Sequence, residues 1–137
     1  KFEKIYNIKR IIYASSSSVY GDNDRLPKIE YDIGNQMSPY ALNKYVNELY
    51  ANLFSKLYCL ETIGLRFFNV FGPRQDPNSP YSSVISKLIT LLLNNKRPTI
   101  YGNGSFSRDF TFVDNVVSFI YLAITTDNKN CFGKVYN

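Results

Sequence analysis

Tyr40 and Lys44 are the residues whose types and spacing most clearly suggest chemistry. They stand four positions apart in a segment with helical periodicity, so their side chains lie on one helix face and can reach the same atom. An ammonium group beside a phenol favours the phenolate and lowers the pKa of the phenol from about 10. Such a pair can act as a base near neutral pH. The spacing by itself is a weak pattern, because Tyr and Lys are both common in helices.

The apolar run Arg10–Ser15 ends on the first of four consecutive serines, residues 15–18. A short continuous apolar run predicts a central parallel strand that is buried on both faces. Ligands of open α/β sheets bind outside the carboxyl ends of the strands. A serine hydroxyl at this position could hydrogen-bond a substrate oxygen together with Tyr40 and shorten the path of a proton to the phenol. The alternative is a serine-rich loop that satisfies its own backbone.

A helix over about Pro39–Leu57 is predicted to carry Tyr40 and Lys44. Ser38 would be its N-cap, Pro39 fits the first helical position, and apolar residues recur at three-to-four spacing. These residues are Leu42, Val46, Leu49, Tyr50, Leu53, Phe54 and Leu57. A polar loop, Gly21–Gln36, precedes the helix and a second strand, Thr62–Phe67, follows it. The order strand, helix, strand predicts a right-handed crossover in a parallel sheet.

The second half of the chain is predicted to continue as an α/β fold. A turn-rich loop runs from Gly72 to Tyr81, and a helix follows over about Val84–Asn94. Two short strands, Thr99–Tyr101 and Asp109–Phe112, would flank a Gly-Asn-Gly turn. A third helix would begin with Asp114 as its N-cap. That helix carries Val117, Ile120, Tyr121 and Ile124 on one face.

Composition narrows the classes of function. The chain has 137 residues, 45% of them apolar and 20% charged, and this is globular composition. The net charge is +5, but the basic residues are interleaved with acids, so no nucleic-acid partner is predicted. The absence of histidine removes Ser-His-Asp and Cys-His mechanisms and most zinc sites, so no metal site is predicted.

Two further features concern the cellular compartment in which the protein is expected. Cys59 and Cys131 match no metal or redox spacing and are predicted to be buried, reduced thiols. The apolar stretches are shorter than the roughly 20 residues of a membrane span, and no signal peptide is recognisable. The sequence therefore predicts a cytoplasmic protein without membrane partners.

Four motifs together carry a family resemblance: Tyr13–Gly21, Ser38–Lys44, Leu65–Arg74 and Ser107–Phe110. In this order and spacing they resemble the extended short-chain dehydrogenase/reductase family, which comprises NAD-dependent nucleotide-sugar epimerases and dehydratases. The resemblance implies a Rossmann fold with tightly bound NAD and a smaller carboxyl-terminal region that binds a nucleoside diphosphate sugar. It also implies a homodimer.

The resemblance implies roles for individual residues. Tyr40 would remove the proton of the sugar hydroxyl, Lys44 would bind the nicotinamide ribose, and Ser16 would orient the substrate alcohol. The other cofactor contacts would be Ala14, Ser15 and Phe67, in addition to Tyr40 and Lys44. The other substrate contacts would be Ser17, Asn69, Gln75, Val84, Thr99, Tyr101 and Arg108.

Two of these substrate contacts have plain alternatives. Arg108 would pair with the diphosphate, for which a guanidinium offers a fixed fork of donors, but it could instead form a surface ion pair. Asn69 would hydrogen-bond the sugar or diphosphate region, but its amide could instead fasten a loop.

The residues that follow the predicted strand Arg10–Ser15 indicate which reaction of the family to expect. Nucleotide-sugar 4,6-dehydratases resemble this segment but have two acids that drive the loss of water, where this chain has Ser17 and Ser18. The resemblance therefore favours a UDP-sugar 4-epimerase that acts through a 4-keto intermediate. It is strongest to the UDP-N-acetylglucosamine 4-epimerases of bacterial surface polysaccharide pathways, and UDP-glucose and UDP-glucuronate epimerases remain as alternatives. A dehydratase or decarboxylase, and a truncated relative that only binds a nucleotide sugar, remain as alternatives.

One departure from the family pattern concerns domain organisation. The Gly-x-x-Gly-x-x-Gly turn that brings the pyrophosphate of NAD to a helix N-terminus is absent from these residues. The chain is therefore expected to be a carboxyl-proximal fragment, inactive alone, with an apolar sheet edge left uncovered. Residues 1–72 would be the second half of the Rossmann domain, and residues 73–137 mostly the substrate-binding region with a returning helix and strand.

Overall fold

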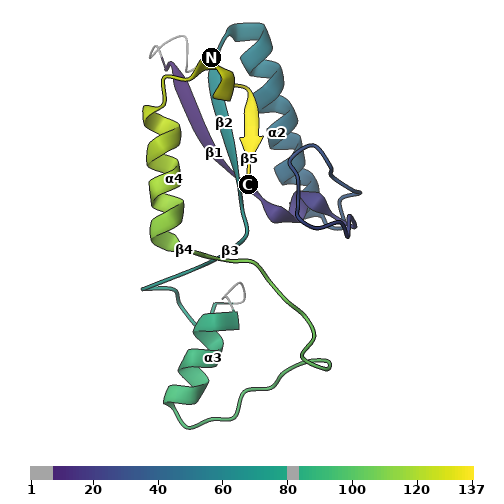
Figure 1. Ribbon diagram of the computed structural model, residues 1–137, viewed down its shortest axis with the longest axis vertical. Helices are drawn as coiled ribbons and strands as arrows, with labels where there is room; N and C mark the ends of the chain where they lie inside the picture. The colour runs from purple at the N-terminus through teal and green to yellow at the C-terminus, as the bar shows by residue number, and fades with distance from the viewer. Residues whose placement is uncertain (1–7, 80–83) are drawn as a thin grey trace. The chain divides into compact units, whose positions relative to one another are not determined.

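The computed structural model describes residues 8–79 and 84–137 (Figure 1). The chain divides into two compact units: one comprises residues 1–67 and 118–137, and the other comprises residues 68–117. The loop expected to reach Tyr81 ends outside the described residues.

The first unit contains a three-stranded parallel sheet in the order β1-β2-β5 (Figure 1). Strand β1 spans Arg10–Ser16, β2 spans Glu61–Phe67 and β5 spans Lys134–Tyr136. The predicted strands and their parallel pairing are confirmed, with Ser15 opposite Arg66 in the register. The expectation that the first strand is central and buried on both faces is wrong within the described residues. There β1 lies at the edge and β2 is the central, buried strand, because an apolar run does not reveal how many strands lie beyond it.

Two helices cover opposite faces of this sheet. Helix α2, Pro39–Tyr58, contacts the face that carries Ser15 and Arg66, through Glu48. Helix α4, Val113–Thr125, places Ala123 against the other face. The core on that face consists of Ile63, Leu65 and Ala123, with Ile12, Phe67, Phe119, Ile120, Cys131, Phe132 and Tyr136 packed around them.

The two ends of α2 follow from local chemistry. Ser38 is the N-cap, since its hydroxyl accepts the Ala41 backbone N–H at 3.1 Å, and Pro39 occupies the first turn as predicted. The helix stops where Cys59 adopts a left-handed conformation, φ 53°. The Cys59 side chain is exposed, which corrects the expectation of a buried thiol: as the C-cap it lies outside the face that packs on the sheet. Cys131 is half-buried and free.

Most apolar residues of α2 do not face the sheet. The two residues of the helix that are fully buried are Ala41 and Glu48. Five residues of the predicted apolar stripe are exposed, namely Leu42, Leu49, Tyr50, Leu53 and Leu57, whereas Val46 and Phe54 are half-buried. The larger part of the stripe that predicted the helix therefore faces away from the core.

The second unit is built on a short parallel pair and one helix. Strand β3, Asn69–Phe71, pairs with β4, Phe110–Phe112, and α3 spans Val84–Leu93. The helix and the later strand are confirmed, but the strand expected at Thr99–Tyr101 is absent from the described residues. β4 pairs with β3 instead, a strand of three residues that is too short to show an alternating pattern.

The start of α4 and two short turns complete the description of the elements. Helix α4 begins at Val113, so Asp114 is the second residue of its first turn and not the expected N-cap. Short 3₁₀ turns lie at Ser17–Tyr20 (η1) and Lys129–Cys131 (η2). The division between the units falls within α4, after Val117.

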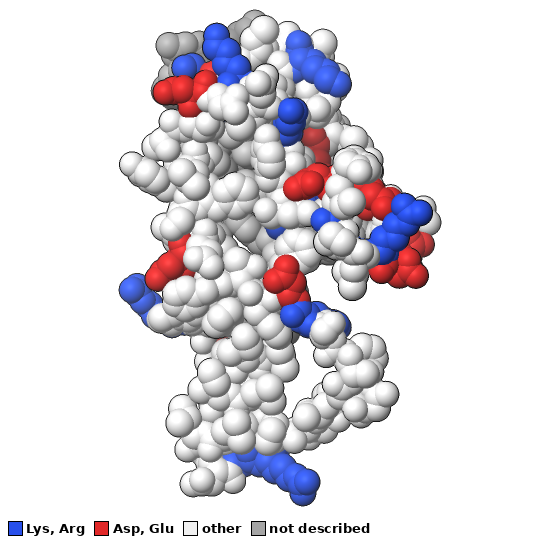
Figure 2. Space-filling view, in the orientation of Figure 1, with Lys and Arg blue, Asp and Glu red and all other residues white. Residues whose placement is uncertain are grey.

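Charge and apolarity are distributed without long single-sign or apolar tracts. On the face drawn in Figure 2, basic and acidic side chains are interspersed, so the net charge of +5 is not gathered into one patch there. None of the helices in the described parts of the chain combines the length and apolarity needed to cross a bilayer.

Candidate active site

The first unit holds Tyr40 and Lys44 together at the start of α2. The Lys44 ammonium donates a hydrogen bond to the Ala14 carbonyl at 2.9 Å and lies 5.7 Å from the centroid of the Tyr40 ring. The Tyr40 side chain is 56% exposed. The lysine is thus fixed to the end of β1, while the phenol beside it is open to a ligand.

Ser16 lies two residues beyond Ala14 and caps the short turn η1. Its hydroxyl oxygen accepts from the Ser18 N–H at 3.2 Å and from the Ser18 hydroxyl at 3.0 Å. Local backbone satisfaction, the plain alternative for the serines, therefore applies to this oxygen. Both bonds leave the Ser16 hydrogen itself available to donate. Ser17 is half-buried as the first residue of η1.

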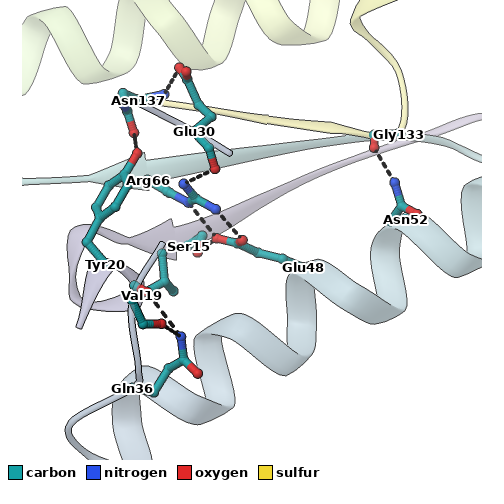
Figure 3. Close-up of polar contacts among 11 residues, drawn as sticks. Ser15, Val19, Tyr20, Glu30, Gln36, Glu48, Asn52, Arg66, Gly133 and Asn137 are labelled. Carbon is teal, nitrogen blue, oxygen red and sulfur yellow. Dashed lines mark hydrogen bonds and ion pairs between the residues drawn. The ribbon is translucent and has the colours of Figure 1, made fainter. Parts of the chain in front are cut away.

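A buried polar network joins β1, β2 and α2 (Figure 3). The Ser15 hydroxyl donates to the Glu48 carboxylate. Arg66 donates to the same carboxylate through Nε at 3.0 Å and Nη2 at 2.7 Å. The three residues are 3–5% exposed. Because the hydroxyl hydrogen of Ser15 is occupied in this way, this hydroxyl has no hydrogen left to donate to a cofactor.

Arg66 has two further partners. Its Nη1 donates to the Glu30 carbonyl at 2.8 Å, and its guanidinium lies 4.8 Å from the centroid of the Tyr20 ring. Burial acts to lower the pKa of Arg66, but the hydrogen bonds and negative charge of Glu48 outweigh it and the pKa is raised. Arg66 is therefore a permanent cation whose charge is balanced inside the protein.

Sequence reasoning missed Glu48 and Arg66, although both left a signal. Glu48 continues the four-residue spacing of Tyr40 and Lys44, and Arg66 is the one charged residue in the run Thr62–Phe67, which was predicted to be a strand. A charged residue in a buried strand needs a partner of opposite charge.

Tyr13 packs on the same face of the sheet. Burial, together with the negative charge of Glu48, raises the pKa of its phenol, and Arg66 opposes this change. A Cβ at Gly64, the residue opposite in the register, would lie 2.5 Å from the Tyr13 ring and hydroxyl. The glycine therefore makes room for the ring.

The predicted substrate contacts Asn69, Gln75 and Arg108 lie in the second unit. The Asn69 side-chain amide donates to the Asp109 carbonyl at 2.9 Å, so it does fasten a loop. The Gln75 amide donates to the Val70 carbonyl at 3.3 Å, while its buried oxygen has no partner among the described residues. An unpaired buried oxygen is costly and fits a site that a ligand donor completes.

Arg108 is exposed and donates to the Ser107 carbonyl at 2.7 Å. Within residues 8–79 and 84–137 it forms no ion pair, so the plain alternative of a surface ion pair is not seen. Its remaining donors are available to an anion. Val84, Thr99 and Tyr101 are also exposed.

Comparison with known proteins identifies the family. Residues 3–137 match the sequence profile of the NAD dependent epimerase/dehydratase family. The chain belongs to this family. The fold is accordingly the Rossmann type shared by its members, and the resemblance noted in the four motifs is confirmed.

Similar proteins of the family include both epimerases and dehydratases. The structure of a UDP-N-acetylglucosamine 4-epimerase from Methanobrevibacter ruminantium M1, in complex with UDP-N-acetylmuramic acid, is 46% identical with a TM-score of 0.86; the match covers 91% of this chain and 40% of that one. The UDP-glucose 4-epimerase of Thermotoga maritima, solved with UDP-glucose, is 34% identical with a TM-score of 0.86, over 98% of this chain and 43% of that one. A dTDP-D-glucose 4,6-dehydratase of Dictyostelium discoideum is 34% identical over 98% of this chain and 32% of its own length. The chain spans 34–41% of the length of the curated relatives that match it first.

The residues of the first unit fit one end of the NAD that gives this family its name. Ala14 and Phe67 line a groove of about 530 Å³ between β1 and α4, together with Ile12, Leu65 and Ile120. The Lys44 ammonium, held at the Ala14 carbonyl, can donate to ribose hydroxyls, and the exposed Tyr40 phenol lies beside it. These donors suit the nicotinamide ribose, whereas the sequence has no glycine-rich turn for the pyrophosphate.

Proposed function

We propose that the full-length gene product is an NAD-dependent UDP-sugar 4-epimerase of the UDP-N-acetylglucosamine or UDP-glucose type. The observation that carries the proposal is the pairing of an exposed Tyr40 phenol with a Lys44 ammonium held at the end of β1. The 46% identity to a UDP-N-acetylglucosamine 4-epimerase supports this choice of substrate class.

In this proposal the chain's own groups move one proton and orient one hydroxyl. The Ser16 hydroxyl, which has its hydrogen free, donates to the oxygen at C4 of the sugar. Tyr40, as phenolate, accepts the proton of that C4 hydroxyl, and Lys44 stabilises the negative charge on the phenolate oxygen. NAD, when bound, supplies the reversible hydride acceptance that makes C4 a carbonyl carbon. Epimerisation would be complete when the hydride returns to the opposite face of C4 and Tyr40 returns its proton to the C4 oxygen.

The serines at positions 17 and 18 separate this reaction from water elimination. A 4,6-dehydratase must protonate a leaving hydroxyl, and that step needs an acid beside the sugar. Ser17 and Ser18 offer hydroxyl groups whose protons are far less acidic than a carboxyl. An epimerase needs no such acid, because its sugar keeps all of its atoms.

The second unit is proposed to bind the nucleoside diphosphate. Arg108 would pair with the diphosphate through the guanidinium donors that no described residue takes up, and Gln75 would accept a ligand donor at its buried oxygen. The remaining proposed contacts with the sugar and nucleoside are Ser17, Asn69, Val84, Thr99 and Tyr101.

The exposed apolar stripe on α2 supports a homodimer. A contiguous apolar face on a helix is typical of an interface. Leu42, Leu49 and Leu53 lie on it, each about half exposed. A second copy of the same helix could cover this stripe and thereby hold the base helix in place.

The test is an activity assay on the purified full-length protein with NAD and each UDP-sugar. We expect interconversion of UDP-N-acetylglucosamine or UDP-glucose with its C4 epimer, followed by NMR. Tyr40→Phe should lower turnover about 10²-fold or more, since general base catalysis typically contributes about 10²–10⁴-fold. The matched control Tyr58→Phe changes an exposed tyrosine at the other end of the same helix and should leave turnover unchanged.

Two results would replace the proposal. A sugar product lighter by one water molecule, or by carbon dioxide, would identify a dehydratase or a decarboxylase. Binding of UDP-sugar without turnover, unaffected by Tyr40→Phe, would identify a non-catalytic relative that only binds the nucleotide sugar.

A further inference from the structure

Glu48, which forms a buried ion pair with Arg66, lies on the same face of α2 as the proposed base, Tyr40. Tyr40, Lys44 and Glu48 follow one another at four-residue spacing on α2, so all three share one helix face. Tyr40 is exposed at one end of this series, and Glu48 is 5% exposed at the other.

This helix face is fastened to β1 at two adjacent residues. Lys44 donates to the Ala14 carbonyl at 2.9 Å, and the Ser15 hydroxyl donates to Glu48. The next residue, Ser16, carries the hydroxyl proposed to orient the substrate. The distance from Ser16 to Tyr40 is therefore set through two neighbouring contacts.

Arg66 fixes the direction of the Glu48 carboxylate. It stands opposite Ser15 in the register and meets both carboxylate oxygens, while its Nη1 is held by the Glu30 carbonyl (Figure 3). A two-point contact between a guanidinium and a carboxylate defines orientation as well as distance. Buried ion pairs are weak evidence for stability, because apolar residues of similar volume are often as stable. Stability alone therefore does not explain why charges are used here.

We propose that the Glu48–Arg66 pair is a positioning device that sets the geometry of Tyr40, Lys44 and Ser16 through Ser15 and Ala14. Neither residue touches the substrate. This inference rests on the proposed function for its kinetic consequence, and its structural consequence can be measured separately.

The test compares Glu48→Gln with the matched control Glu61→Gln in the full-length protein. Glu61 pairs with Arg10 at 2.8 Å across the same two strands, at the end away from the serines. We expect Glu48→Gln to lower kcat about tenfold to a hundredfold with little change in KM, because small misplacements of reacting groups have effects of this size. Glu61→Gln should leave kcat unchanged. Equal kcat for Glu48→Gln and the wild type would overturn the proposal.

A paired apolar substitution, Glu48→Leu with Arg66→Met, covers the case in which Glu48→Gln does not fold. It removes both charges, so no unpaired charge stays buried. A positioning role predicts a folded protein, with a melting temperature near that of the wild type, whose kcat stays at least tenfold low. If this variant instead has both the melting temperature and the kcat of the wild type, the pair has only a structural role.

A spectroscopic measurement separates this inference from the proposed function. With 3-fluorotyrosine at position 40, Glu48→Gln should shift the ¹⁹F resonance of that ring, and Glu61→Gln should not. If the wild type converts no UDP-sugar, the proposed function is wrong, while the ¹⁹F signal still decides whether Glu48 positions Tyr40. An unchanged ¹⁹F resonance in Glu48→Gln would overturn the positioning role in either case.

Discussion

The two units of the molecule hold their candidate site residues in different ways. In the first unit, Lys44 and Ser16 are fixed by hydrogen bonds to β1 and η1, above a buried ion pair. Every fully buried residue among those described belongs to this unit except Val116. In the second unit, Thr99, Tyr101 and Arg108 are exposed in a segment without regular structure.

The difference matches the two tasks proposed for the units, which are catalysis in the first unit and substrate binding in the second. Groups that must meet within fractions of an ångström are placed by the core, whose packing admits few arrangements. Groups that recognise a substrate lie on loops, where substitutions alter binding with little effect on folding. The comparison predicts that changes in the first unit reduce stability and those in the second unit reduce binding.

The largest effect on stability is expected from Arg66→Met. This change leaves the Glu48 carboxylate buried without its cation, and breaking a buried pair in this way typically costs about 3–5 kcal/mol. The measurement is the free energy of unfolding in urea, on the full-length protein. A loss below about 1 kcal/mol would mean that water reaches Glu48 and that the first unit is less tightly packed than the comparison requires.

A smaller loss of stability is expected from Gly64→Ala. The added methyl group would lie 2.5 Å from the ring of Tyr13, which must shift within a packed layer. Overpacking of this kind typically costs about 1–3 kcal/mol. The pair Gly64→Ala with Tyr13→Leu should recover part of the loss, because the shorter side chain leaves room for the methyl group. No recovery in the pair would show that the strain arises elsewhere in β2.

Tyr136, on the edge strand β5 of the same unit, is expected to make stability depend on pH. Burial, together with Cys131 and Glu30, raises the pKa of its phenol to about 12. A phenol whose pKa is higher in the folded state than in the unfolded state stabilises the fold below about pH 10. That contribution is lost as the pH rises from about 10 to 12. Wild type should therefore lose stability relative to Tyr136→Phe over this interval, with a constant difference at pH 7–9; a constant difference throughout would contradict the shift.

The sequence predicted those parts of the molecule that rest on local or strongly periodic signals. Ser38 and Pro39 marked the start of α2, and apolar runs marked β1 and β2. Strand β3 was missed because three residues show no period. The exposed apolar stripe of α2 could not be assigned to the surface, because spacing shows that residues share a face and not what the face packs against.

The candidate site shows the same limits. Tyr40, Lys44 and Ser16 were found because their types and spacing suggest chemistry. The Glu48–Arg66 pair was missed because it joins a helix to a strand 18 residues later, a contact that spacing along the chain does not reveal. The sequence carried two signals of the pair: the arginine within the strand Thr62–Phe67, and the four-residue spacing of Glu48 from Lys44.

The smallest effect on stability is expected from Arg108→Gln in the second unit. The side chain is exposed and its described partner is the neighbouring Ser107 carbonyl, so the free energy of unfolding should change by less than about 0.5 kcal/mol. Hydrogen bonds from a charged group contribute roughly 1.5–3 kcal/mol, so the KM for UDP-sugar should rise about tenfold to a hundredfold if Arg108 pairs with the diphosphate. Arg97→Gln, a control at another exposed arginine of the same unit, should change neither quantity. An unchanged KM in Arg108→Gln would remove Arg108 from the substrate site, and a large loss of stability would show that the second unit, too, depends on buried charge.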